Sequence, residues 1–149
     1  MAEYDTISTE TWKIHLPSNW SEQQSGAENT LCLESADHTK GAYLSTWCFS
    51  DDPRSAKEIL ESFRSVELRS FQAMKDKSWE SVSESSSDLQ DATALAIDLL
   101  DRQAHYRIVC YLLCRLPWVV RASFHDYECA DYEVSRQFFQ PIIESLQIH

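Results

Sequence analysis

The sequence predicts a single α+β domain over residues 1–149, in which an antiparallel β-sheet of about six to seven strands packs with two main α-helices. The first observation is the stretch 92–126, where apolar and polar residues alternate through three segments separated by short gaps. The second is the helical spacing of apolar residues in 53–75 and 132–146. Alternation of period two indicates half-buried strands, and one apolar stripe indicates a helix packed on a sheet face.

Strands and turns are predicted for the chain before the first helix. Residues 10–16 alternate Trp12, Ile14 and Leu16 with polar residues, and the turn composition of Pro17 to Trp20 ends that strand. The remaining assignments of this part are a polar loop at 21–29, a short strand at 30–34, a turn at 35–41 and a third strand at 42–49.

Helix boundaries are predicted from capping residues. Asp52 is a suitable N-cap and Pro53 a suitable first helical residue, so the first helix is expected to run from there to about Lys75. A weak edge strand at 79–83 and a polar hairpin loop at 84–91 should follow. Asp131 is predicted to cap the last helix, and Pro141 predicts a kink or a restart within it.

The register of the last two of the three strands predicted in 92–126 follows from the rule that directly paired residues share a face. A two-residue turn at Leu116-Pro117 would place Leu112 opposite Arg121. A three-residue loop that includes Arg115 instead pairs Leu112 with Val120 and keeps apolar residues together, so we expect that register.

The turn between the first two of these three strands is predicted to centre on Arg102-Gln103. It places Ile97 opposite Ile108 and forms an opposite-charge pair between Asp98 and Arg107. The sheet then has an apolar face that contains Ile108, Leu112 and Phe124. The other face is mixed and consists of Asp98, Arg107, Val109, Tyr111, Leu113, Arg121, Ser123 and His125.

Composition limits the classes of partner. The formal net charge of −11 argues against binding to nucleic acid and to anionic membrane surfaces. The first residues lack the basic and apolar regions of a signal peptide, which predicts a cytoplasmic protein. The five cysteines, an odd number without paired spacing, fit reduced thiols in that compartment.

Sequence motifs for cofactors, metals and nucleophilic catalysis are missing. The two glycines, Gly26 and Gly41, form no phosphate-binding loop, and neither CxxC nor HExxH occurs, so no cofactor, metal or catalytic residue is predicted. His105 and His125 are interpreted as solvated or hydrogen-bonded structural histidines. Cys129 near His125 lacks a group to orient a nucleophile–base pair.

The tryptophans are predicted to divide into two groups. Trp12, Trp47 and Trp118 alternate with polar neighbours, which predicts core positions, whereas Trp20 and Trp79 are freer to contact a partner.

Several of these patterns together resemble a known family, the PsbP-like α/β/α domains. The resemblance rests on the opening W-x-I-x-L-P-x-x-W, the strand at 42–46, the meander D-x-x-D-R-Q-x-H-Y-R at 98–107, and the terminal F-x-x-I-x-x-S-L at 139–146. The family includes PsbP of photosystem II, a Ran-binding release factor, the DcrB and LpqN lipoproteins and the effector-associated Eag chaperones of type VI secretion. The chain lacks a lipoprotein signal and a transit peptide, and no Ran-binding surface aligns with it.

Two functional hypotheses follow. The resemblance implies a non-enzymatic bacterial-type binding protein, an adaptor or chaperone that holds a partner's apolar helix on the mixed sheet face. Its candidate partner-binding residues are Arg107, Tyr111, Leu113, Arg121 and Trp20. In the competing interpretation the second helix covers that face and leaves no groove.

The alternative hypothesis is a small-ligand-binding protein or enzyme with a pocket near Tyr111, Arg121 and His125. A concave pocket that contains a strongly shifted pKa would favour this alternative. A flat or grooved apolar patch would favour the protein partner. The oligomeric state stays open, with a homodimer among the alternatives.

Overall fold

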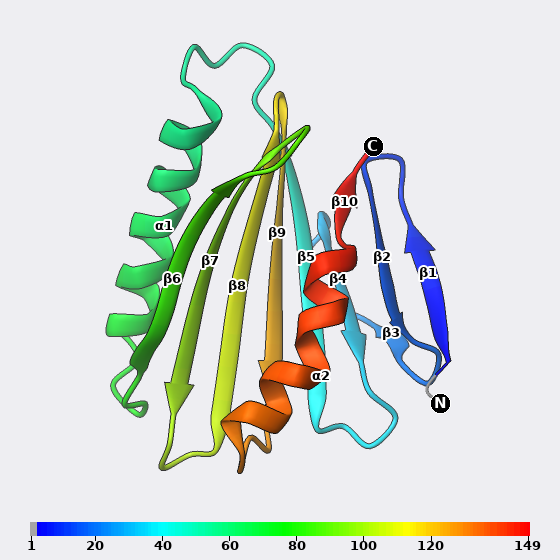
Figure 1. The fold of residues 1–149 in the computed structure, drawn as a ribbon, viewed down its shortest axis with the longest axis vertical. Coiled ribbons are helices and arrows are strands. Elements are labelled where there is room, and N and C mark those ends of the chain that lie inside the picture. The colour runs from blue at the N-terminus through cyan, green and yellow to red at the C-terminus, as the bar shows by residue number, and fades with distance from the viewer. Residues whose placement is uncertain (1–2) are drawn as a thin grey trace.

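The computed structural model describes residues 3–149 and contains ten strands and two helices. The strands are β1 (Tyr4–Ser8), β2 (Trp12–Pro17), β3 (Ser21–Gln23), β4 (Thr30–Glu34), β5 (Lys40–Cys48), β6 (Glu80–Asp88), β7 (Thr93–Asp101), β8 (Tyr106–Arg115), β9 (Trp118–Asp126) and β10 (Gln147–Ile148). The helices are α1 (Ala56–Gln72) and α2 (Tyr132–Ser145). Seven strands form one antiparallel sheet in the order β3-β4-β5-β9-β8-β7-β6, and β1-β2-β10 form a second (Figure 1).

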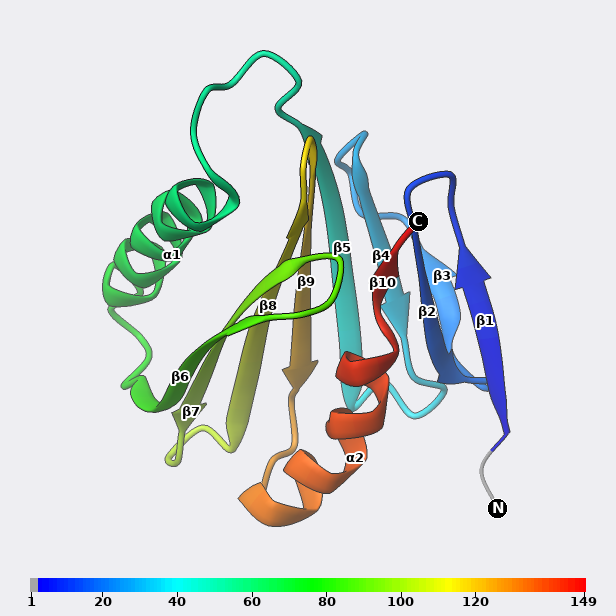
Figure 2. The same cartoon turned by 45° about the horizontal axis from the view of Figure 1, so that its top comes forward.

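The two helices lie on opposite sides of the seven-stranded sheet, so both of its faces are covered (Figures 1 and 2). Helix α1 packs on β7 and β8, and its core includes Ile59, Ile97 and Leu112. On the other side α2 and the small sheet form a second core, which includes Phe124 and Phe139. The predicted α+β architecture of an antiparallel sheet with two helices is confirmed.

Helix α1 begins three residues later than predicted. Its N-cap is Ser55, whose side chain accepts a hydrogen bond from the Glu58 backbone while the Glu58 carboxylate accepts one from the Ser55 backbone. This capping box satisfies two backbone donors at once. Asp52 instead binds the backbone and guanidinium of Arg54, which is why it does not cap the helix.

Strand β6 extends through most of the segment predicted to be a hairpin loop at 84–91. Its serine-rich sequence is polar because β6 is an edge strand whose residues are nearly all exposed. Strands β1, β3 and β10 were not predicted. They are short, and β1 and β3 are also largely exposed, so they lack the clear alternation that marks a half-buried strand.

The predicted register of β8 and β9 is wrong by one residue. The turn is Leu116-Pro117 alone, and it places Arg115 opposite Trp118 and Leu112 opposite Arg121. The prediction assumed one apolar and one mixed face, whereas the sheet has a core on each face. Arg121 can lie opposite Leu112 because Glu67 of α1 pairs with its guanidinium.

The first central turn is also displaced, this time by two residues, so Ile97 pairs with Cys110 and Leu99 with Ile108. A shift of two keeps every side chain on its predicted face. The predicted ion pair of Asp98 and Arg107 is present, between diagonal neighbours in the ladder. The predicted burial of Ile108, Leu112 and Phe124 is confirmed, although Phe124 faces α2 and the other two face α1.

Asp131 caps α2 as predicted, and the helix continues through Pro141 without a restart. The tryptophan assignments are only partly correct. Trp12 is buried, but Trp47 is only partly buried, and Trp118, which lies beside the β8–β9 turn opposite the exposed Arg115, is 37% exposed. Among the described residues, no helix is long and apolar enough to cross a membrane.

Candidate functional site

The mixed sheet face divides between the two sides of the sheet. Arg107, Tyr111 and Leu113 face α2, whereas Arg121 faces α1 together with Ser123 and His125, because the corrected register inverts the faces of β9. Trp20 lies on the α2 side, where its ring stacks on Phe138 at 6.4 Å between centroids. The five candidate partner-binding residues therefore do not form one surface.

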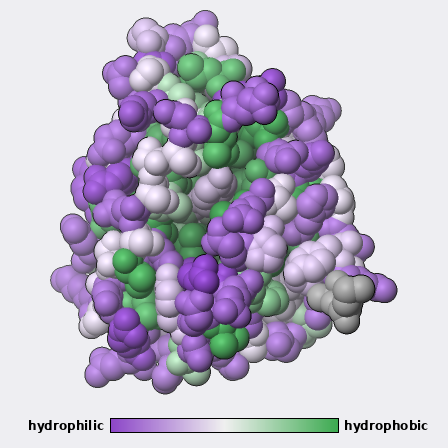
Figure 3. All heavy atoms as spheres, in the orientation of Figure 1, coloured by the Kyte–Doolittle hydropathy of each residue, from purple (hydrophilic) through white to green (hydrophobic). Residues whose placement is uncertain are grey.

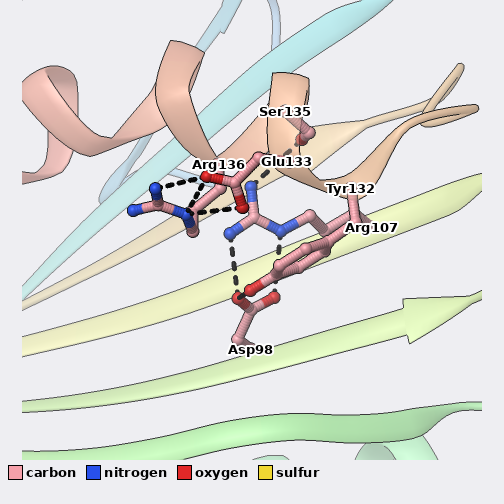
Figure 4. Close-up of polar contacts among 6 residues, drawn as sticks. All are labelled: Asp98, Arg107, Tyr132, Glu133, Ser135 and Arg136. Atoms are coloured by element: carbon pink, nitrogen blue, oxygen red, sulfur yellow. Dashed lines mark hydrogen bonds and ion pairs between the residues drawn. The ribbon is translucent and has the colours of Figure 1, made fainter.

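On the α2 side, Arg107 is the centre of a buried polar network (Figure 4). Its Nε and Nη2 donate to the two carboxylate oxygens of Asp98 at 3.0 and 2.9 Å, and its Nη1 donates to Ser135 Oγ at 3.0 Å. Tyr132 donates its hydroxyl to Asp98 at 2.6 Å and places its ring 4.8 Å from the Arg107 guanidinium. The network ties the first turn of α2 to β7 and β8.

This network leaves little for a partner to contact. Arg107 is 3% exposed and Leu113 is 2% exposed, so a partner would have to displace part of the core on this side to reach them. On the face seen in Figure 3, hydrophobic side chains form small separated patches among polar ones. On this side α2 and the small sheet cover the seven-stranded sheet, so the competing interpretation holds only for the part of the mixed face that lies here.

On the α1 side, a cleft of about 440 Å³ lies between the C-terminal half of α1 and the sheet. Strands β8, β9 and β5 supply its floor, α1 supplies one wall, and Thr30 of β4 lies at its far side. The residues that line it are Thr30, Tyr43, Ser45, Glu67, Ser70, Phe71, Met74, Tyr106, Ile108, Arg121, Ser123 and His125.

An ion pair joins α1 to the sheet in this cleft. The Nε and Nη2 atoms of Arg121 donate to the two carboxylate oxygens of Glu67, the second at 3.0 Å. Glu67 is buried and the Arg121 side chain is 24% exposed. The charges of the two side chains cancel. Within residues 3–149, no acceptor is within hydrogen-bond reach of Arg121 Nη1.

His125 is held by two hydroxyl groups in the same cleft. Its Nδ1 lies 2.5 Å from Tyr106 Oη and its Nε2 lies 2.8 Å from Ser123 Oγ. Burial and the nearby Arg121 charge lower the pKa of His125 to about 4. Burial also raises the pKa of Tyr106 to about 12. At neutral pH the imidazole is therefore uncharged, with one ring nitrogen donating a hydrogen bond and the other accepting one.

Ser123 and His125 have the separation of a nucleophile and its base, but the surrounding groups do not support that chemistry. The residue that orients His125 is the phenol of Tyr106, whereas a carboxylate would raise the basicity of the ring. An imidazole with a pKa of about 4 has little tendency to accept a proton from serine. Cys129 is buried on the other side of the sheet, near Ser135 and Arg107. The geometry favours binding through hydrogen bonds.

Stability below neutral pH should depend on His125. In the unfolded chain the ring binds a proton near its ordinary pKa of 6.5, whereas in the folded protein it does so only near pH 4. Between these values the unfolded state binds more protons, so lowering the pH should remove up to roughly 3 kcal/mol of stability. Urea unfolding from pH 7 to pH 4.5 should show a shallower loss for His125→Gln than for the wild type. If the free energy of unfolding falls equally with pH in the wild type and in His125→Gln, the fold does not hold His125 neutral.

Two of the three residues of the predicted pocket meet here. Arg121 and His125 line the cleft. Tyr111 pairs with Ala122 in the ladder and faces the α2 side of the sheet, away from the cleft. The sequence analysis did not single out Glu67 or Tyr106. Glu67 carried a usable signal, because it lies four residues from both Phe63 and Phe71 on the apolar stripe of α1, where a carboxylate needs a buried partner.

A scan against protein-family models finds no match, and a search of curated proteins finds none. The solution structure of cyanobacterial PsbP (CyanoP) from Synechocystis sp. PCC 6803 is similar over 100% of this chain and 94% of that chain, with a TM-score of 0.72 and 9% identity. A Bacteroides thetaiotaomicron protein has a TM-score of 0.49 and 13% identity, over 93% of this chain and 45% of that chain.

The similarity to CyanoP establishes the fold alone, because the sequences are so different. The chain has a PsbP-like fold, as its sequence patterns predicted. Within residues 3–149, no group of three or more histidine, cysteine, aspartate or glutamate side chains is placed to hold a metal ion.

Proposed function

We propose that this PsbP-like domain is a non-enzymatic binding protein that holds a small ligand in the cleft between α1 and the sheet. The observation that carries the proposal is the convergence of Arg121, His125 and Tyr106 on one concave site. Its volume of about 440 Å³ lies within the range of small-molecule sites. Its apolar surfaces, such as Ile108 and Phe71, are combined with a few placed polar groups, which is the usual composition of such sites.

The shifted pKa of His125 supports the same proposal. Strongly perturbed titratable groups are concentrated at functional sites, although buried structural groups are perturbed too. What distinguishes this histidine is that it lines the open cleft while its two nitrogens are held by Tyr106 and Ser123. A group fixed in this way presents a rigid polar surface to a ligand.

A substitution at the mouth of the cleft tests the proposal. Ser70 is exposed on α1 and lines the cleft, so Ser70→Trp should fill it without disturbing the core. Ser65→Trp on the same helix is the matched control, because Ser65 is exposed and lies outside the lining. We expect the uncharged fluorescent probe N-phenyl-1-naphthylamine to bind the wild type and Ser65→Trp, with at least roughly tenfold weaker binding to Ser70→Trp.

Two results would contradict the proposal. One is equal binding of the probe to Ser70→Trp and Ser65→Trp, which would place the bound probe elsewhere. The other is a wild-type protein that binds neither this probe nor any other uncharged aromatic molecule small enough for the cleft, since a partly apolar cleft of this size should accept one.

A second candidate function is the adaptor or chaperone that the resemblance implies, with the partner on the α1 side. The observation in its favour is that α1 packs on β7 and β8, while Ser21 and Gln23 of β3, whose register puts them on the same face, are exposed. A partner's segment would extend from the cleft across these residues, whereas a small ligand would end near Thr30. If binding requires Ser21 and Gln23, the partner segment is favoured; if it does not, the small ligand is favoured.

A further inference from the structure

We infer that the cleft selects an uncharged, planar ligand that carries a carbonyl oxygen, an inference that rests on the proposed function. It names the chemical class of the ligand from three properties of the site: the balance of its charges, the one donor that is left free, and the aromatic rings around it.

The charge balance excludes an ionic ligand. The only full charges on the lining residues at neutral pH are those of Glu67 and Arg121, which pair with each other. His125 is neutral because its pKa is lowered to about 4. A charged ligand would lose its hydration here and find no unpaired opposite charge, which is costly. An uncharged ligand avoids that cost.

The free donor specifies an oxygen acceptor. Arg121 uses Nε and Nη2 for the two oxygens of Glu67, and Nη2 also lies 3.9 Å from Cys110 Sγ. Nη1 has no protein acceptor among the described residues, and the side chain is partly exposed on the cleft. A guanidinium N–H makes a charge-assisted hydrogen bond, stronger than one between neutral groups. A carbonyl oxygen is the uncharged acceptor that suits it best.

The other polar groups of the floor are already engaged. Thr30 Oγ1 and Ser45 Oγ lie 2.8 Å apart and bond to each other. Ser123 and Tyr106 both bond to His125. The ligand therefore needs few polar atoms besides the one that meets Arg121.

Aromatic rings favour a planar ligand. Tyr106 lies in the lining, and Trp79 packs behind it with ring centroids 5.2 Å apart. Trp79 also packs on Phe71, the aromatic residue of the α1 wall, at 5.5 Å. Rings supported in this way keep their orientation and offer edges and faces to a flat molecule.

The test compares three two-ring probes by calorimetric titration. Coumarin is planar and uncharged and has a carbonyl oxygen, naphthalene lacks the oxygen, and coumarin-3-carboxylate adds a charge. We expect the wild type to bind coumarin roughly tenfold more tightly than either of the others. In the double variant Glu67→Gln/Arg121→Gln, which removes the guanidinium donor without leaving a buried charge unpaired, the preference over naphthalene should fall to about twofold or less.

The outcomes separate this inference from the proposed function. Equal binding of coumarin and naphthalene to the wild type, both weakened by Ser70→Trp, would overturn the ligand class and leave the cleft as the binding site. Tighter binding of coumarin-3-carboxylate would overturn it too, since it would show an unbalanced positive charge. Binding of N-phenyl-1-naphthylamine without binding of coumarin would likewise count against the inference alone. If no probe binds, the proposed function fails with it.

Discussion

Replacing Arg107 with alanine is expected to lower the free energy of unfolding by about 3–5 kcal/mol. The substitution leaves the carboxylate of Asp98, a residue that is 7% exposed, without its bidentate partner. Tyr132 still donates one hydrogen bond to it, but a single neutral donor does not compensate a buried charge. Ser135, which is also buried, loses the Arg107 donor as well. Urea unfolding at neutral pH should show a lower midpoint with an unchanged slope.

Two controls show that the loss comes from the unpaired charge. In the double variant Asp98→Leu/Arg107→Met, apolar groups replace both charges, so it should be more stable than Arg107→Ala by about 2 kcal/mol or more. Arg136→Ala, which removes the neighbouring exposed pair with Glu133, should cost less than about 1 kcal/mol. A loss at Arg107 no larger than the loss at Arg136 would show that the network contributes nothing special to stability.

Arg107 has a different role in the structure from the one predicted for it. It was a candidate partner-binding residue because it lay on the predicted mixed face of the sheet, to which the family resemblance assigned a partner's helix. In the structure its charge is used internally, to fix the first turn of α2 on the sheet. Of the two arginines of the predicted mixed face, Arg121, on the other side of the sheet, is the one that keeps a donor without an acceptor among residues 3–149.

Strand identity could be predicted from the sequence because it depends on local alternation, which is clear in β7, β8 and β9. Register depends on which faces are buried, and that is a property of the whole fold. A sheet with a core on each face accepts apolar residues at odd and even positions alike, as Val119 and Val120 show. The parity argument therefore had no firm basis at the β8–β9 turn.

The same reasoning explains how far the site could be predicted. Arg121 and His125 lie four residues apart on one strand, so their common face follows from strand geometry and is independent of register. Tyr111 lies on another strand, and the one-residue error moved it to the wrong side. Glu67 and Tyr106 come from elements far apart in sequence, and the ladder and helix packing that join them to Arg121 and His125 are tertiary properties.

Leu112→Ala tests the corrected arrangement of the central strands and should lower the free energy of unfolding by about 2–5 kcal/mol. Leu112 is fully buried on the α1 side and lies on β8, which is hydrogen-bonded to a strand on each side. The backbone there cannot move into the space that the smaller side chain leaves. Only α1 can shift toward it, and the Glu67–Arg121 pair resists that movement. Most of the cavity should therefore persist.

Leu89→Ala is the matched control for this prediction, because Leu89 is 47% exposed in the β6–β7 turn. Leu89→Ala should lower the free energy of unfolding by no more than about 0.5 kcal/mol, as for most substitutions at exposed positions. Because Leu112 packs under α1, the variant should also loosen the helix and weaken probe binding in the cleft, which Leu89→Ala should leave unchanged. A loss at Leu112 below about 0.5 kcal/mol would mean that its side chain is not in a packed core, and the position of α1 over the sheet would then be wrong.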